Sequence, residues 1–226
     1  MTKLGKNISK SNEDKLMVFY YKSMEYYENN KNRVYLIVTS IVVVIALIFF
    51  YFNYKTKNNE TAGIELSKVK MVYSSGLYQQ AINGDSLGMS RGLQYIVDNY
   101  GSSENGEIAK VMLANCYYSL RDYNNAEKFY KDYSGSNDIY KAASNAGIAS
   151  VYEAKSDFPN AANYYMKASK QSKLVTNNDE YMFYAIKNYS LANDVENLKK
   201  TIKELKKEYP KSKYLAQINR YDKGDE

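Results

Sequence analysis

The chain has 226 residues, a formal net charge of +6, one cysteine and no histidine. This composition excludes an internal disulfide, a metal site built on His or Cys, and a Ser-His or Cys-His catalytic dyad. Residues 1–33 and residues 55–226 each contribute +3 with both signs mixed, which is typical of a solvated surface rather than of a nucleic-acid-binding patch. We therefore expect no metal ion, no cofactor and no nucleic-acid partner.

Residues 1–33 are expected to form a tail. Residues 1–14 are polar, and we expect them to lack regular structure. Apolar residues at helical spacing predict a short amphipathic helix over residues 15–30, carried by Leu16, Phe19, Tyr20, Met24 and Tyr27. Such a helix either lies on the membrane surface or docks on a membrane partner, and the pattern leaves both interpretations open.

Residues 34–54, VYLIVTSIVVVIALIFFYFNY, contain no charge and are bounded by Arg33 and Lys55. A helix of this length extends about 31 Å, the thickness of the hydrocarbon core of a bilayer, and tyrosines near both ends favour the headgroup zone. The pattern indicates a single transmembrane helix rather than a buried helix of a soluble core. A cleaved signal peptide is disfavoured, because the apolar run is too long and no good small-residue cleavage site follows it.

The orientation of the span is only weakly encoded. Lys and Arg number seven in the tail, but within twenty residues of the span four lie on each side. The positive-inside rule therefore leans towards a cytoplasmic tail, and long domains are translocated largely regardless of their charge. We predict a cytoplasmic N-terminus and a C-terminal domain on the opposite side of the membrane.

After a short polar linker expected at residues 55–62, the segment 63–226 shows an internal repeat. The stretch LANCYYSLRDYNNAEKFYKDY begins at Leu113, and IASVYEAKSDFPNAANYYMKA begins at Ile148. Five positions recur 35 residues apart: Tyr117, Asp122, Tyr123, Ala126 and Tyr130 return as Tyr152, Asp157, Phe158, Ala161 and Tyr165. A third, less regular copy begins at Ala185 at a step of 37 residues, with Tyr189 and Asp194 in the matching places.

This pattern resembles the tetratricopeptide repeat (TPR), a 34-residue helix–turn–helix unit. Small alanines let the two helices approach, and Asp122 and Asp157 fall in the turn, where a short side chain can cap the next helix. An earlier unit is expected from Ile64, interrupted by an insertion at residues 82–90, and a closing helix at residues 211–221. We therefore expect an all-α protein: a single N-terminal transmembrane helix followed by a TPR α-solenoid of about three to four repeats plus the closing helix.

Solenoids of this kind usually bind on the concave face made by the first helix of each repeat. The repeat alignment places these candidate peptide-binding residues there: Asn115, Tyr118, Ser119, Ser150, Glu153, Phe183, Lys187 and Ser190. The basic clamp of chaperone-tail-binding repeats is absent, because Val111 and Gly147 occupy two of its positions. A groove for an unfolded or extended segment is the remaining expectation, and Cys116 is expected to be a small core residue.

Enzyme signatures are missing from the sequence. No phosphate-binding loop, dinucleotide-binding fingerprint or paired-carboxylate constellation stands out, and Asp85 and Asp138 are single acids in turns. We expect a binding protein and not an enzyme, with an enzyme that uses carboxylates alone as the alternative.

The combination of anchor, tail and repeats resembles the bacterial YfgM-like ancillary subunits of the Sec translocon. The stretch from Asn83 to Tyr130 is similar in cadence to Bacteroidetes-type members. The resemblance implies a single-pass inner-membrane protein with a cytoplasmic N-terminus and a periplasmic TPR domain. Its expected partners are Sec translocon subunits, exported chains and periplasmic chaperones. The alternative is a scaffold or assembly factor for another cell-envelope complex, such as a secretion or motility machine.

Overall fold

The computed structural model describes residues 4–85 and 88–221, and every regular element within these ranges is a helix. The prediction of an all-α protein is confirmed for this part of the chain. The chain divides into two compact units, Met1–Tyr54 and Lys55–Glu226. The outermost residues of the expected tail and of the expected repeat domain, 1–3 and 222–226, lie outside the described residues.

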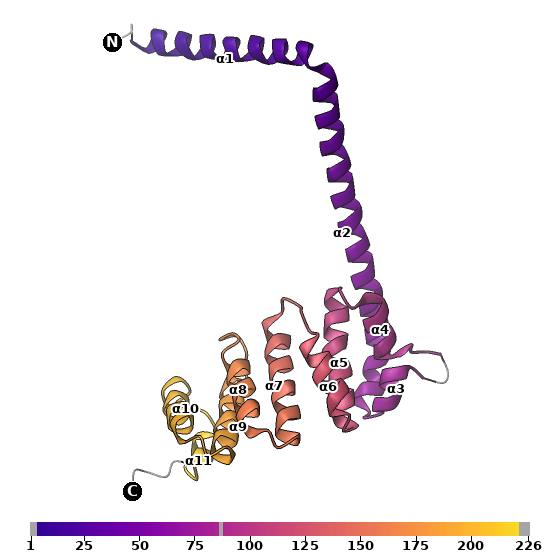
Figure 1. Ribbon diagram of the computed structural model, residues 1–226, viewed down its shortest axis with the longest axis vertical. Helices are drawn as coiled ribbons and strands as arrows, with labels where there is room; N and C mark the ends of the chain where they lie inside the picture. The colour runs from indigo at the N-terminus through magenta and orange to yellow at the C-terminus, as the bar shows by residue number, and fades with distance from the viewer. Residues whose placement is uncertain (1–3, 86–87, 222–226) are drawn as a thin grey trace. The chain divides into compact units, whose positions relative to one another are not determined.

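The first unit contains α1 (Leu4–Asn29) and the beginning of α2 (Lys31–Ser74) (Figure 1). α1 is longer than the helix expected at residues 15–30, and the expectation that residues 1–14 lack regular structure is wrong from Leu4 onward. No proline interrupts this stretch, so the helix continues towards the N-terminus. The two helices contact each other across Asn30, where the hydroxyl groups of Tyr27 and Tyr35 are 2.9 Å apart.

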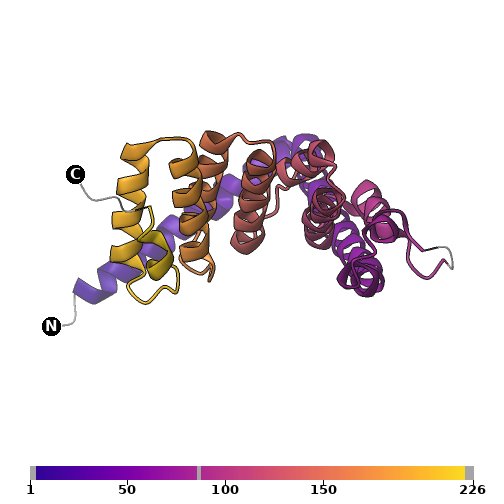
Figure 2. The ribbon, with the colours of Figure 1, turned by 90° about the horizontal axis from the view of Figure 1, so that it is seen from below.

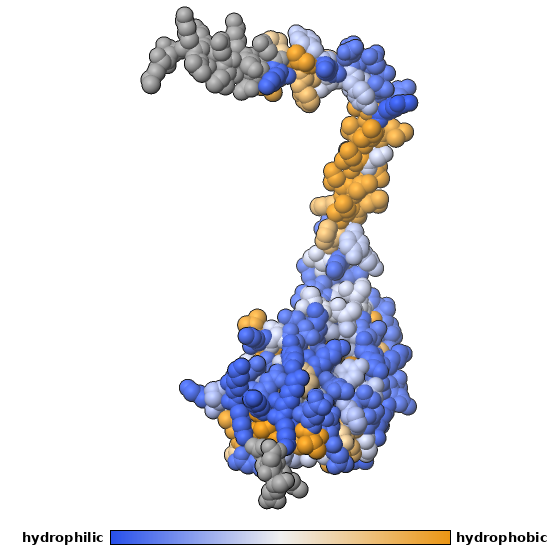
Figure 3. All heavy atoms as spheres, turned by 60° about the vertical axis from the view of Figure 1, so that its left-hand side comes forward, coloured by the Kyte–Doolittle hydropathy of each residue, from blue (hydrophilic) through white to orange (hydrophobic). Residues whose placement is uncertain are grey.

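No residue that the structure describes packs around the apolar segment of α2. Its large side chains from Tyr35 to Tyr54 are exposed on every side of the helix, and Figure 3 shows them as a continuous hydrophobic band. Among the described residues, α2 is the one helix long and apolar enough to cross a membrane. A core helix of a soluble protein would bury most of this surface, whereas the apolar window of α2 is 0% buried.

The polar linker expected at residues 55–62 is not a linker. These residues continue α2 without a break, because they contain neither glycine nor proline. Two hydrogen bonds join this part of α2 to the start of α5 (Glu104–Ser119). The Asn105 backbone N–H donates to Asn59 Oδ1 at 2.8 Å, and Asn105 Nδ2 donates to the Asn59 carbonyl at 3.0 Å. Ala62 is fully buried, so the segment belongs to the packed unit that follows.

The described residues of the second unit contain the end of α2 and nine further helices. These are α3 (Tyr78–Asn83), α4 (Gly92–Tyr100), α5 (Glu104–Ser119), α6 (Tyr123–Lys131), α7 (Asp138–Ala154), α8 (Phe158–Ser169), α9 (Asn178–Leu191), α10 (Val195–Glu208) and α11 (Leu215–Ile218). Consecutive helices from α3 onward pack against one another in chain order, which Figures 1 and 2 show as a row of neighbouring helices. The closing helix expected at residues 211–221 is much shorter, since only Leu215–Ile218 is helical.

Three turns in this row have the same structure. The α5–α6, α7–α8 and α9–α10 turns each place one residue in the left-handed region, with φ of 62° at Arg121, 61° at Ser156 and 56° at Asn193. In each turn the next residue is the N-cap of the following helix, and its aspartate accepts a hydrogen bond from the backbone of an asparagine three positions later. The predicted capping by Asp122 and Asp157 is therefore confirmed, and Asp194 repeats it.

The packing between hairpins depends on one glycine. A Cβ atom added at Gly147 would lie 2.3 Å from the Tyr130 ring, so only glycine lets α7 approach this side chain of α6. The alanines of the repeat pattern, Ala126 and Ala161, are fully buried, as the packing argument requires. Cys116 is also fully buried, and burial raises the pKa of its thiol to about 12, which confirms it as an inert core residue.

Candidate functional site

Asn115, the first of the predicted binding residues, lies within a row of tyrosine hydroxyls. Its Nδ2 donates to Tyr73 Oη at 3.1 Å, and its Oδ1 accepts a hydrogen bond from Tyr130 Oη. Burial raises the pKa of Tyr130 far above its usual range, and burial also raises that of Tyr73. Both hydroxyls therefore stay neutral and act as hydrogen-bonding groups that hold α2, α5 and α6 together.

Ser150 repeats this contact one hairpin later. It stands 35 residues after Asn115, just as Tyr165 stands 35 residues after Tyr130. Ser150 Oγ lies 3.0 Å from Tyr165 Oη, and the same tyrosine donates to Glu153 Oε2 at 3.3 Å. A tyrosine of the second helix thus bonds to the same position of the first helix in both hairpins.

Glu153 is the centre of the charged part of this surface. Its Oε1 lies 2.7 Å from Lys187 Nζ, and its Oε2 accepts a hydrogen bond from Asn188 Nδ2 at 3.1 Å. The hydrogen bond and charge of Glu153 raise the pKa of Lys187. These contacts join α7 to α9 across two hairpins and neutralise both charges, so a ligand that binds here competes with an ion pair.

The other predicted residues do not join this network. Tyr118 packs its half-buried ring against Tyr123, and Ser119 is exposed at the end of α5. Phe183 is 6% exposed and stacks on a tyrosine of the C-terminal segment, so it supports packing. Ser190 lines a separate cavity of about 240 Å³ beside α10.

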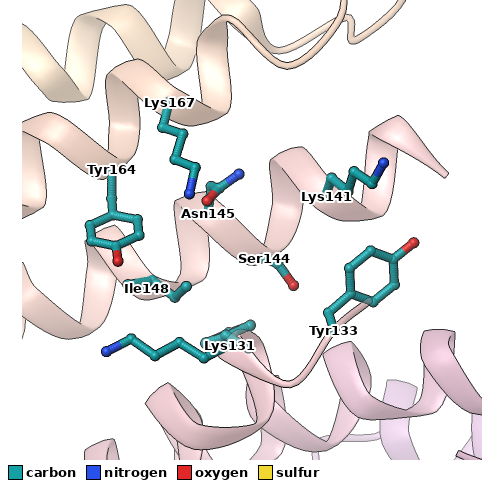
Figure 4. Close-up of a pocket in the computed structure, with 9 residues that line it drawn as sticks. Lys131, Tyr133, Lys141, Ser144, Asn145, Ile148, Tyr164 and Lys167 are labelled. Carbon is teal, nitrogen blue, oxygen red and sulfur yellow. The ribbon is translucent and has the colours of Figure 1, made fainter. Parts of the chain in front are cut away.

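The structure reveals a cavity that the repeat analysis missed. It has a volume of about 210 Å³ and lies between α6, α7 and α8 (Figure 4). We call it the α7 cavity, and it is lined by Tyr130, Lys131, Tyr133, Lys141, Ser144, Asn145, Ile148, Tyr164 and Lys167. Three of these residues are lysines and none is acidic, which distinguishes the cavity from the nearly neutral surface around Glu153.

The α7 cavity escaped prediction because its residues are not a motif. They come from three helices and from Tyr133 between α6 and α7, at irregular spacing, and several occupy positions that vary between repeats. One signal was present in the alignment: Lys167 stands 35 residues after Asp132, which is a reversal of charge at equivalent positions. Among the described residues, no cluster of three or more His, Cys, Asp or Glu side chains could hold a metal ion.

Comparison with known proteins gives no relative for this chain: no family model, no curated protein and no solved structure matches it. Its function therefore has to be argued from the geometry of these two surfaces and from the apolar helix.

Proposed function

We propose that the chain is a membrane-anchored scaffold whose TPR-like helical repeats bind other proteins. The observation that supports this best is the repeated turn. In three successive hairpins, one residue in the left-handed region is followed by an aspartate that caps the next helix. Hairpins that repeat in this way present equivalent side chains at regular intervals, and such a surface can bind an extended segment of a partner.

The membrane anchor gives this binding a location. The apolar part of α2 has the length and exposure of a bilayer-spanning helix, and tethering raises the effective concentration of the repeat domain at any membrane partner. In our proposal α1 and the N-terminus are cytoplasmic and the repeat domain is periplasmic. The Sec translocon is the proposed partner, on the strength of the family resemblance alone, and the repeats would pass exported chains to chaperones.

The carboxylates on the described surface favour binding over acid–base catalysis. A catalytic acid needs a raised carboxyl pKa, whereas hydrogen bonds from Lys131 and Lys155 lower the pKa of Glu127 to about 2. Glu153 forms an ion pair with Lys187, with 2.7 Å between Oε1 and Nζ. Both groups therefore act as fixed charges that position neighbouring helices.

Photo-crosslinking in native membranes tests the proposal. A photoreactive phenylalanine analogue replaces Tyr26 in α1, Leu47 in the span or Ser119 on the repeat domain, and Lys203 on α10 serves as the matched exposed control. We expect translocon subunits at the first two positions, exported chains or chaperones at Ser119, and neither at Lys203. Recovery of a secretion or motility machine at Leu47 would instead support the alternative scaffold. Capture of no protein at any of the three sites would refute a protein-binding role.

The proposed topology has its own test. Lys15→Cys and Lys213→Cys each add one exposed thiol, while the native Cys116 stays unreactive because it is buried. A membrane-impermeant maleimide added from the periplasmic side should label the second variant and leave the first unlabelled. The opposite labelling would reverse the orientation and remove the periplasmic assignment.

A further inference from the structure

A buried ion pair on α5 is fully hydrogen bonded. Lys110 Nζ lies 3.0 Å from Glu107 Oε1 and 3.2 Å from Asp132 Oδ2. The Glu107 carboxylate also accepts hydrogen bonds from the backbone N–H of Ser134 at 2.8 Å and from its hydroxyl at 2.7 Å. We call this set of four residues the α5 cluster, and its buried carboxylate has a partner for each oxygen.

The equivalent positions 35 residues later have lost that carboxylate. Ala142 stands in the place of the glutamate, Asn145 in that of the buried lysine, and Lys167 in that of the exposed aspartate. The equivalent serine, Ser169, is kept, but its hydroxyl turns to the carbonyl of Met166 in its own helix. Relative to the first set, two acids and one lysine are replaced, and one lysine, Lys167, is gained at a position that lines the α7 cavity.

One side chain in the α7 cavity has no partner among the described residues. Ser144 is 5% exposed, and its hydroxyl makes no hydrogen bond with any residue that the structure describes. Asn145, which is 8% exposed, lines the same cavity. A buried polar group left unpaired is costly, so native proteins place water or a ligand beside such groups. The cavity therefore presents the Ser144 hydroxyl and the Asn145 amide to whatever occupies it.

The charge around the α7 cavity is unbalanced. Figure 4 shows the Lys167 ammonium pointing towards Asn145, and this lysine has no ion pair with a described residue; its other neighbour is the Tyr164 ring at 5.5 Å. Lys131 shares the single Glu127 carboxylate with Lys155, which leaves one positive charge in excess there. An anion in the cavity would meet uncompensated positive charge together with the unpaired Ser144 hydroxyl.

We propose that the α7 cavity binds a carboxylate group, which takes the role that the side chain of Glu107 has in the α5 cluster. Its volume of about 210 Å³ admits a carboxylate together with several waters, each of which occupies about 30 Å³ in the liquid. Lys167 supplies the charge, and Asn145 and Ser144 supply hydrogen bonds. The carboxylate comes either from a small free acid or from an acidic side chain of a bound polypeptide. The second source would deepen the proposed scaffold function, whereas the first is independent of it.

Amide NMR of the full chain in an uncharged detergent tests this site. The probes are acetate, a blocked Gly-Ser-Glu-Ser-Gly peptide and the matched Gly-Ser-Gln-Ser-Gly peptide. Saturable shifts are expected for the Asn145 side-chain amide and for neighbouring backbone amides of α7, with acetate and with the Glu peptide but not with the Gln peptide. Tighter binding of the Glu peptide than of acetate would identify a polypeptide as the source. Equal binding would identify a free acid and leave the scaffold proposal to stand or fall by crosslinking.

Variants separate the site from a general effect of charge. Lys167→Gln should weaken binding by about tenfold, since a hydrogen bond to a charged group contributes on the order of 1.5 kcal/mol. Lys203→Gln, which removes an exposed lysine on α10, should bind as the wild type does. Ala142→Glu restores the internal carboxylate and should abolish binding. If that variant fails to fold, Lys167→Gln still decides the matter. An absence of saturable shifts, equal shifts with the Gln peptide, or unchanged binding in Lys167→Gln would overturn the proposal.

Discussion

The α5 cluster and the α7 cavity are built on the same hairpin plan but have opposite electrostatic character. Both lie beside the first helix of a hairpin, and each following turn has one residue in the left-handed region followed by an aspartate cap. In the α5 cluster a buried carboxylate has a partner on each oxygen, while in the cavity the Ser144 hydroxyl has no hydrogen-bond partner among the described residues and the lining holds three lysines and no acid. The comparison teaches that conserved turn geometry leaves the positions between turns free to become either a structural ion pair or a binding site.

Removing the carboxylate of the α5 cluster should have the largest effect. Glu107→Ala leaves the Lys110 ammonium, whose side chain is 10% exposed, with the exposed Asp132 as its remaining acidic partner. Breaking a buried ion pair typically costs about 3–5 kcal/mol, and we expect a loss near the lower value, measured by urea unfolding of the full chain in detergent. Glu104→Ala, an exposed acid of the same helix, is the control. An equal loss in both variants would show that the buried pair contributes nothing special.

A second difference between the two regions is Gly147, which stands where the preceding repeat has Met112. Gly147→Ala drives a methyl group into the Tyr130 ring and should destabilise the domain by about 1–3 kcal/mol, as overpacked cores do. Urea unfolding measures the loss. The double variant with Tyr130→Leu should recover part of it, because the contact is then relieved. Strictly additive losses would mean that α7 shifts without strain.

The shared turns predict equal effects in both hairpins. Asp122→Ala and Asp157→Ala should each cost about 1 kcal/mol, because each removes a carboxylate that accepts from a backbone N–H, at 3.1 Å and 3.3 Å respectively. The corresponding Asn variants retain a capping oxygen and should lose much less. Thermal unfolding followed by circular dichroism compares the four proteins. A large difference between the two alanine variants would show that the turns are energetically different despite their geometry.

The smallest expected effect concerns pH. Hydrogen bonds from Lys131 and Lys155 lower the pKa of Glu127 from 4.5 to about 2, so the folded state holds this carboxylate ionised more firmly than the unfolded state does. Its contribution to stability is complete above pH 4.5 and declines as the pH falls towards 2. Glu127→Gln should lower the stability at pH 6 and flatten this part of the pH profile, measured as the urea midpoint. A variant whose profile still parallels the wild type would assign the acid sensitivity to other carboxylates.

Part of the surface around Glu153 was predictable and part was not. The repeat alignment placed Glu153 and Lys187 on one face, because the first helices of successive hairpins share a face, but it did not pair them. It did not identify Asn188 or the role of Tyr165, since hydrogen bonds between hairpins depend on side-chain rotamers and on interhelical distance. The α7 cavity is lined by side chains from α6, α7, α8 and the segment between α6 and α7, and no local pattern brings these together.

The sequence by itself determined the features that depend on local spacing: the uncharged apolar segment, the helical periodicity, and the aspartates that cap helices in the repeated turns. These are decided within one or two turns of helix, where intrinsic propensity and capping dominate. Tertiary structure alone decided that residues 55–62 continue a helix docked on Asn105, that Gly147 receives the Tyr130 ring, and that Lys167 faces a cavity without a carboxylate. Those outcomes depend on which side chains meet across separate helices, and these contacts form only when the chain folds.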